Sequence, residues 1–138
     1  MDKAVPIISS LVIFDQLTKY FFRAGNVVDL GFLQLHFVKN TGTLWGLFQG
    51  VNWFFMTFSI IVLIGMFYWR KKFVGKVESW VWPLIVSGAI GNLLDRIFVG
   101  FVTDFIDFGW WPAFNVADSC ISIAIVLLIL NEFKVFSK

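Results

Sequence analysis

The stretch Ser87–Ser122, SGAIGNLLDRIFVGFVTDFIDFGWWPAFNVADSCIS, places polar side chains between two apolar segments. The chain is 59% hydrophobic and only 14% charged, yet four of its nine acidic residues lie here. Ionisable groups at a membrane edge cost several kcal/mol to insert, so they are functional candidates by default. The stretch is therefore the first place to look for a site. Its polar candidates are Asn92, Asp95, Arg96, Asp104, Asp107, Asn115 and Asp118.

The composition of the whole chain is typical of a bilayer protein. Mean hydropathy is +0.83, with 18 Phe and 7 Trp, and 138 residues suffice for one domain, 1–138. A net charge of +2 indicates no nucleic-acid partner. Cys120 and His36 are the lone cysteine and histidine, so one chain can build no disulfide and no zinc protease site. We expect no metal and no cofactor.

Four apolar segments, at about 5–22, 51–69, 80–100 and 114–130, approach the roughly 20 residues that a helix needs to cross a bilayer. The first lacks a small-residue cleavage site after its apolar run, so we interpret it as a retained span rather than a signal peptide. Residues 24–50 differ, because apolar and polar side chains alternate over Phe32–Val38 as in a short strand. We expect a small extramembrane sheet there. Gly42, Gly46 and Gly50 also fit a helix contact, so a partly helical region stays open.

Basic residues concentrate at one end of the expected spans. These are Lys3, Arg70, Lys71, Lys72, Lys76, Lys134 and Lys138, whereas the other end holds Arg23 and Lys39, with Arg96 near the boundary. By the positive-inside rule, both termini are cytoplasmic. Residues 24–50 and a loop at 100–113 then lie outside, together with the four acidic residues of the opening stretch.

Polar residues share faces on three of the segments. Asp15 and Lys19 are spaced i, i+4, so they can pair, with Arg23 one turn further on. The pair is either a structural link between helices or part of the site. Asn92, Asp95 and Arg96 share a face of the third segment, after the small residues Ser87, Gly88, Ala89 and Gly91 that permit close helix packing. Asn115, Asp118, Ser119 and Ser122 form a polar stripe on the fourth.

Asp104 and Asp118 are the candidates for chemistry. Asp104 falls at or just past the end of the third segment and Asp118 about one turn into the fourth, so a short loop would bring both to similar depth. Two carboxylates at one depth can share a proton, and then one acts as base on a water and the other as acid. That is the aspartic-protease arrangement, and it needs no metal, cysteine or serine.

Other interpretations stay open at this point. Asn115 and Asp118 also fit an N-cap and an N3 acid at a helix start, and Asp95 with Arg96 fits a helix-end ion pair. Asp104 and Asp107 could be solvated loop acids. By class, the alternatives are a carboxylate-pair hydrolase, a small proton- or ion-relay membrane subunit, and a structural membrane subunit.

Four ordered blocks resemble the lipoprotein signal peptidases, the prolipoprotein or type II signal peptidases of bacteria. They are DQLTKY at 15–20, KNTGTLWGLF at 39–48, SGAIGNLLDRIFVGFVTDFIDF at 87–108 and FNVADSCI at 114–121. Two differences stand out. Ser87 replaces a usual glycine, and Thr43 and Leu44 replace two usual alanines.

The resemblance implies an all-α membrane protein with four transmembrane helices and a small extracytoplasmic β-cradle, about 24–50, between helices one and two. It implies an aspartic endopeptidase of the cytoplasmic (inner) membrane that removes signal peptides just before a diacylglyceryl-modified cysteine. The partners would be lipidated prolipoproteins and membrane lipid, and we expect a monomer. The catalytic pair would be Asp104 and Asp118. Supporting residues would be Asp15, Lys19, Asn40, Gly42, Asn92, Asp95, Arg96 and Asn115, whereas Asp107 is expected to be a loop acid near water.

Overall fold

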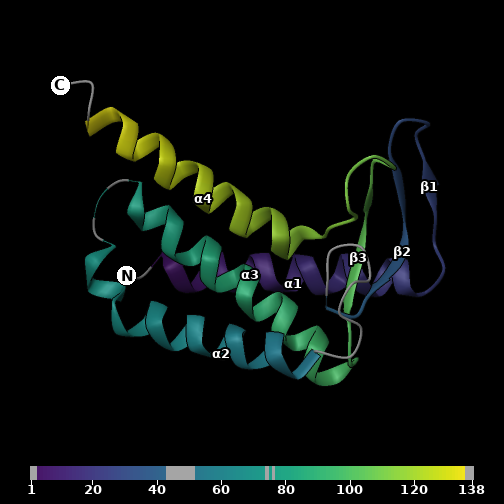
Figure 1. The fold of residues 1–138 in the computed structure, drawn as a ribbon, viewed down its shortest axis with the longest axis horizontal. Helices are drawn as coiled ribbons and strands as arrows, with labels where there is room; N and C mark the ends of the chain where they lie inside the picture. The colour runs from purple at the N-terminus through teal and green to yellow at the C-terminus, as the bar shows by residue number, and fades with distance from the viewer. Residues whose placement is uncertain (1–2, 43–51, 74, 76, 136–138) are drawn as a thin grey trace.

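A computed structural model describes residues 3–42, 52–73, 75 and 77–135. It contains helices, a short 3-10 turn and three strands (Figure 1). In chain order they are α1 (Ala4–Arg23), β1 (Val28–Asp29), β2 (Gln34–Asn40), α2 (Asn52–Tyr68), η2 (Arg70–Lys72), α3 (Glu78–Phe98), β3 (Val102–Asp107) and α4 (Val116–Val135). The expectations for Thr43, Leu44, Gly46, Gly50, Lys76 and Lys138 fall outside the described residues, as does the side chain of Lys134.

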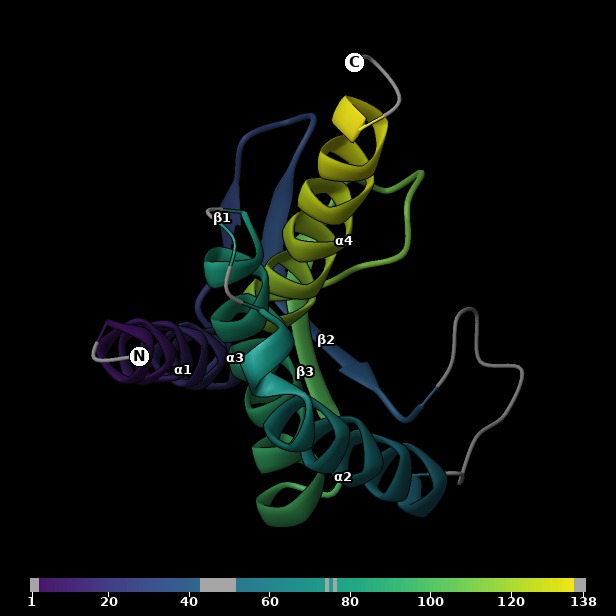
Figure 2. The same ribbon diagram turned by 90° about the vertical axis from the view of Figure 1, so that its left-hand side faces the viewer.

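Helix α3 lies at the centre of the bundle, where α1, α2 and α4 all pack against it (Figures 1 and 2). Two glycines make this packing possible. A Cβ added to Gly88 would lie 2.6 Å from Cγ1 of Ile121 on α4. One added to Gly91 would lie 2.6 Å from Oδ2 of Asp15 on α1. Real Cβ atoms do not come so close to a neighbour, so glycine is required here. The close approach expected from the small residues of this segment is confirmed at these positions.

Three helices of the described part are long and apolar enough to cross a membrane: Ala4–Arg23, Ser79–Phe98 and Val116–Phe133. Helix α2 is apolar but shorter, with 17 residues. Large apolar side chains such as Leu17, Ile64 and Val126 are exposed, whereas polar ones are buried between the helices. This is the reverse of the distribution in a soluble protein, as expected where lipid is the solvent. The chain is therefore a mostly helical, multi-pass membrane protein.

A small antiparallel sheet of order β1-β2-β3 lies at one end of the bundle (Figure 1). The strand predicted over Phe32–Val38 is confirmed as β2, shifted by two residues. Strand β2 places Val38 opposite Asp104 and Asn40 opposite Val102, with an irregularity between Leu35 and Val38.

Strand β3 corrects the prediction of a loop over 100–113 and of a sheet confined to the region between the first two helices. Its first four residues, 102–105, are all buried. A strand buried on both faces lacks the alternation by which strands are recognised in sequence. Helix α3 ends at Phe98, and Gly100 then adopts a φ of +87° that a residue with a Cβ rarely adopts. The chain therefore turns into β3, and Asp104 lies on a strand.

Candidate active site

Asp104 lies within β3 and is only 2% exposed. Both of its carboxylate oxygens accept a hydrogen bond from a side-chain amide. Asn40, the last residue of β2, donates from Nδ2 to Oδ2 at 2.8 Å, and Asn115 donates from Nδ2 to Oδ1 at 2.7 Å. Strand pairing and the start of α4 therefore set the position of this carboxylate together.

Asp118 lies in the first turn of α4, where it forms a reciprocal cap with Asn115. The Asn115 side-chain oxygen accepts from the backbone N–H of Asp118 at 2.9 Å, and Asp118 Oδ2 accepts from the backbone N–H of Asn115 at 3.2 Å. The N-cap interpretation is therefore confirmed. The same Asn115 also donates to Asp104, so the cap and the carboxylate pair share a residue.

Asn92 on α3 holds the other oxygen of Asp118. It donates from Nδ2 to Asp118 Oδ1 at 2.7 Å, and its own Oδ1 accepts from Lys19 Nζ at 3.0 Å and from Asn115 Nδ2 at 3.1 Å. An ammonium group has only donors, so Lys19 must meet the oxygen of Asn92. The amide nitrogen is thereby turned toward Asp118. All four carboxylate oxygens of Asp104 and Asp118 thus accept a defined hydrogen bond.

Asp15 and Lys19 form the ion pair predicted from their spacing, at 2.8 Å and with both side chains buried. Asp15 Oδ1 also accepts from the backbone N–H of Ala117 at 2.8 Å, so a carboxylate of α1 caps the start of α4. A negative charge there is favourable for the helix dipole. The pair therefore links helices and also orients Asn92, which combines the two roles considered from the sequence.

Asp95 and Arg96 are not paired with each other among the described residues, so that interpretation is wrong. Asp95 lies 3.2 Å from Arg23 Nη1 and 3.6 Å from Lys19 Nζ, and it accepts from the backbone N–H of Thr103 at 2.7 Å. Neighbours on a helix point about 100° apart, and Asp95 points toward α1 and β3.

Arg96 is half-buried on the α2 side of α3. Its Nη1 donates to the backbone oxygen of Asn92 at 3.4 Å, and its guanidinium lies 5.4 Å from the centre of the Phe55 ring. Its Nε has no hydrogen-bond partner in the described part of the chain.

Three further residues join the network and were not assigned to the site from sequence. Arg23 and Thr103 contact each other and Asp95, and Gln16 donates to Asp15 and to the backbone oxygen of Gly91. The only sequence signals were the spacing of Arg23 one turn after Lys19 and the adjacency of Thr103 to Asp104. Neither signal identifies the residues that Arg23 and Thr103 contact.

Gly42 supports Asn40 from the turn after β2. Its backbone N–H donates to Asn40 Oδ1 at 3.0 Å, and its φ of +126° favours glycine. With its oxygen held by Gly42, Asn40 presents its amide nitrogen to Asp104. The structure therefore brings every residue that the sequence analysis assigned to the site into one connected cluster, except that Arg96 touches it only through Asn92.

The electrostatics of β3 differ between its two acidic residues. Burial raises the pKa of Asp104 to about 7, and the negative charge of Asp118 adds to the rise, while the Asn40 and Asn115 amides oppose it. The pKa of Asp107 is lowered instead, chiefly by the backbone N–H of Gly109 and then by His36, whose Nε2 lies 3.0 Å from Asp107 Oδ2. Asp107 ends a strand rather than lying in a loop, but it is partly open to water, as expected.

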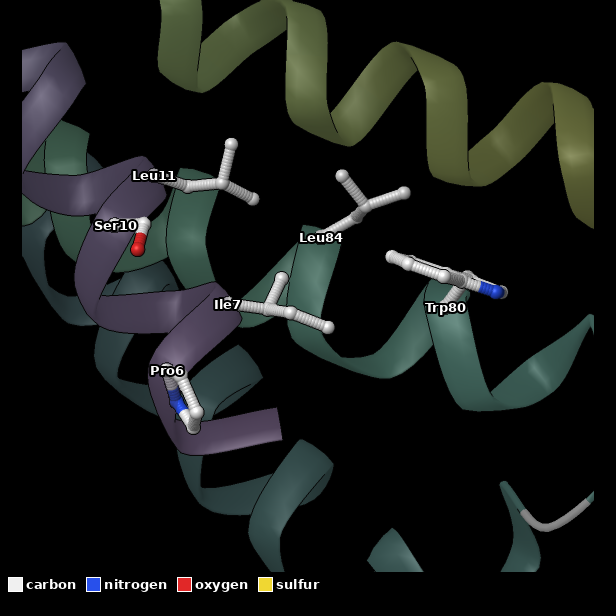
Figure 3. A pocket seen from close by; sticks show the side chains of 6 residues that line it. All are labelled: Pro6, Ile7, Ser10, Leu11, Trp80 and Leu84. Atoms are coloured by element: carbon white, nitrogen blue, oxygen red, sulfur yellow. The ribbon is translucent and has the colours of Figure 1, made fainter. Parts of the chain in front are cut away.

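Among the described residues, neither a metal-binding cluster nor the apolar groove of Figure 3 offers a site for the chemistry. No group of three or more His, Cys, Asp or Glu side chains there could hold a metal ion. A groove of about 400 Å³ lies between the starts of α1 and α3 (Figure 3). Its lining carries no titratable group, because it consists of Pro6, Ile7, Ser10, Leu11, Trp80 and Leu84.

One buried and one partly buried aspartate, both held by amide donors, are an arrangement with which one carboxyl group can act as acid and the other as base on the same water. The class of protein that this fold and site define is a membrane-embedded aspartic hydrolase. The model of the family described as signal peptidase (SPase) II matches residues 7–134, and the chain belongs to that family. Its members are aspartic peptidases of the membrane, and the resemblance inferred from the four sequence blocks is confirmed.

Relatives and solved structures agree with this family. The lipoprotein signal peptidases of Syntrophomonas wolfei subsp. wolfei and Thermodesulfovibrio yellowstonii are 39% and 40% identical to the chain over 135 residues. In both cases the match covers 90% of this chain and 90% of the relative. A solved structure of a bacterial membrane enzyme has a TM-score of 0.87 and 35% identity, and covers 97% of this chain and 89% of its own.

Proposed function

We propose that the chain removes the signal peptide from prolipoproteins that carry a diacylglyceryl group, by cutting the peptide bond just before the lipidated cysteine. Family membership supports the reaction, and the names of the relatives support the substrate class. The observation that carries the assignment to residues is the shared Asn115, which donates one hydrogen bond to Asp104 and another to Asp118.

Asp104 and Asp118 are the proposed catalytic residues, and they act on a water without a covalent intermediate. We assign the shared proton to Asp104, because burial and the nearby Asp118 raise its pKa to about 7, and we assign the role of base to Asp118. Asp118 takes a proton from the water as its oxygen attacks the scissile carbonyl carbon, and Asp104 protonates the carbonyl oxygen. When the tetrahedral intermediate collapses, the C–N bond breaks and the leaving nitrogen takes the proton from Asp118. One hydroxyl of the intermediate returns its proton to Asp104 as the carbonyl group re-forms, so both carboxyl groups regain their starting states.

Supporting residues hold this pair in register. Asn40 and Gly42 fix Asp104 from the strand side, Asn92 and Lys19 fix Asp118 from the helix side, and Asp15 fixes the start of α4. Because these groups are already bonded before substrate arrives, little reorganisation is needed during the reaction. Residues 1–138 would act as one peptidase domain and as a monomer.

The proposed topology has four spanning helices, α2 included, with both termini in the cytoplasm and the aspartates on the extracytoplasmic side of the cytoplasmic membrane. It is supported by charge: Lys3, Arg70, Lys71 and Lys72 belong to the end of the bundle where α1 and α3 start, opposite the sheet (Figure 1). A lipidated precursor would then reach Asp104 and Asp118 at the extracytoplasmic surface of the cytoplasmic membrane.

A proton- or ion-relay subunit is not favoured. A relay needs ionisable groups across the whole bilayer. In the described part of the chain, the buried ionisable residues Asp15, Lys19, Asp95 and Asp104 all belong to the one network beside the sheet.

The test is cleavage of a diacylglyceryl-modified precursor by the full-length protein in lipid bilayers. The expected products are the free signal peptide and a protein that begins with the lipidated cysteine, both identified by mass spectrometry. The matched control is the same precursor without the lipid, which should stay intact. Equal cleavage of both precursors, or of neither, would contradict the proposal.

A further inference from the structure

Thr103, the residue directly before Asp104, has all three of its polar atoms engaged. Its backbone N–H donates to Asp95 Oδ2 at 2.7 Å, its backbone oxygen accepts from Asn115 Nδ2 at 3.2 Å, and its hydroxyl oxygen accepts from Arg23 Nη1 at 2.9 Å. The residue is fully buried, with an exposed fraction of 0%. Thr103 is therefore held from three directions: by α3 and by the N-cap residue of α4 through its main chain, and by α1 through its side chain.

Arg23 closes a ring of contacts at this point. It is the last residue of α1, and its Nη1 bridges the Thr103 hydroxyl and Asp95 Oδ1, the latter at 3.2 Å. Because Asp95 Oδ2 binds the Thr103 N–H, the three side chains connect α1, α3 and β3 in a closed loop. We call Arg23, Asp95 and Thr103 the strand clamp.

The clamp lies on the edge of β3 that has no strand beside it at Thr103. Strand β3 pairs with β2 on one side, and on its other side Phe105 and Ile106 form backbone hydrogen bonds with Phe114. At Thr103 a carboxylate and an amide supply the hydrogen bonds that another strand would supply. Without the clamp, β2 would hold this part of β3 from one edge alone, and a small shift of the strand would displace the Asp104 carboxylate relative to Asp118.

We propose that Arg23 and Thr103 are positioning residues for the reaction, which hold Asp104 at the correct distance and angle through Asp95. The proposal rests on the proposed function, because it assigns Asp104 to the chemistry. Because the clamp sets the position of Asp104, we expect both residues to act on the rate of the chemical step rather than on binding of the precursor. Misplacement of a reacting group by about 1 Å can lower a rate by about two orders of magnitude, so a small rotation suffices.

The test measures kcat and KM of full-length variants on the lipidated precursor, with thermal unfolding as a check on the fold. Arg23→Met keeps the long side chain and should lower kcat about tenfold with KM within about twofold. Thr103→Val keeps the β-branched shape and should lower kcat about threefold. Both changes break one clamp, so the double variant should be about as slow as Arg23→Met, which is about tenfold below wild type. Independent effects would instead make it about thirtyfold slower than wild type. Arg23→Lys restores a cation beside Asp95 without the bridge, so its kcat should be intermediate.

Two further variants separate the possible outcomes. Arg70→Met makes the same chemical change in η2, at the far end of the bundle, and should leave kcat unchanged. If Asp104→Asn retains wild-type turnover, the proposed function of the pair fails. If Asp104→Asn is inactive while Arg23→Met and Thr103→Val keep wild-type kcat, the clamp alone is refuted. Additive losses, or a raised KM at unchanged kcat, would also refute it. If Arg23→Met does not fold, Thr103→Val decides the question by itself.

Discussion

Asp104 and Asp107 lie three residues apart on the same strand, yet their surroundings are opposite. Asp104 is 2% exposed, its oxygens bind neutral amides, and its pKa rises to about 7 because of burial and the nearby Asp118. Asp107 is partly exposed, and the Gly109 N–H and His36 lower its pKa. One carboxyl group is thus prepared to carry a proton near neutral pH, and the other stays ionised.

The difference comes from what covers each end of β3. Residues 102–105 are buried against the helices, where Phe105 stacks on Phe22 of α1 with ring centres 4.7 Å apart. The end of the strand emerges toward Gly109 and the loop that follows. Identical side chains therefore have different ionisation properties because only Asp107 is exposed to bulk solvent, which is how the environments of carboxyl groups in enzymes generally differentiate them.

The largest expected effect is loss of turnover when either member of the proposed pair becomes an amide. Asp104→Asn and Asp118→Asn should each lower kcat by at least about a thousandfold, because neither an amide acid nor an amide base can complete the proton transfers. Asp107→Asn, on the same strand, is the matched control and should remain within about twofold of wild type. Rates are measured by release of the signal peptide from the lipidated precursor. Comparable losses of kcat in Asp104→Asn and Asp107→Asn would contradict the inference that burial gives these two residues different roles.

Substitutions of Asn115 distinguish its role as the N-cap of α4 from its proposed role in the chemistry. Asn115→Ser keeps a capping oxygen but loses the Nδ2 donor that reaches Asp104, so kcat should fall about a hundredfold. The unfolding temperature should fall as well, because the buried oxygens of Asn92 and Thr103 lose the same donor. Asn115→Ala should show a similar rate loss and an additional destabilisation of about 1 kcal/mol, because the cap is lost as well. A serine variant with wild-type kcat would mean that Asn115 serves only the helix.

The pH dependence of kcat should reflect the ionisation of Asp104 and not that of Asp107. A pKa raised to about 7 means that Asp104 is protonated below this pH and loses its proton above it. If Asp104 is the acid, kcat should decline about tenfold per pH unit above about pH 7 and should also decline in acid, where Asp118 becomes protonated.

Two variants sharpen this pH test. Asp107→Asn should leave the declines of kcat in acid and above about pH 7 unchanged. Asn40→Ala removes an amide that lowers the pKa of Asp104, so the alkaline limb should move to higher pH. A kcat that is flat from acid to pH 9 would contradict the shared-proton mechanism.

Much of this site was predictable from local spacing. The i, i+4 rule placed Asp15 against Lys19, and the four apolar segments correspond to the observed helices within a few residues at each end. The expected depth of the segments paired Asp104 with Asp118, and the family resemblance then favoured this pair over the alternative of solvated loop acids. The structure adds a physical reason for choosing Asp104 over Asp107, because these two residues differ in burial.

The rest depended on contacts between residues distant in sequence. Strand β3 has no alternation because both of its faces are buried at the start, so it was predicted as loop. The nearest basic residue to Asp95 is Arg96, but the real partners, Lys19 and Arg23, are 76 and 72 positions away along the chain. Arg23 and Thr103, 80 positions apart, meet only because α1 and β3 pack side by side.

The smallest expected effect concerns the exposed end of β3. His36 and Asp107 connect β2 to β3 across partly exposed side chains, so their pairing should contribute less than about 1 kcal/mol. His36→Gln and Asp107→Asn should each lower the unfolding temperature at pH 7 only slightly, and the double variant should lose no more than the larger single loss. The lowered pKa of Asp107 contributes its full stability above the unfolded value of about 3.9, and this contribution is lost as the pH falls through the lower folded pKa. The Asp107→Asn deficit should therefore vanish in strong acid. A rate loss above about tenfold in His36→Gln, with unfolding unchanged, would instead show that this end of the strand also takes part in the chemistry.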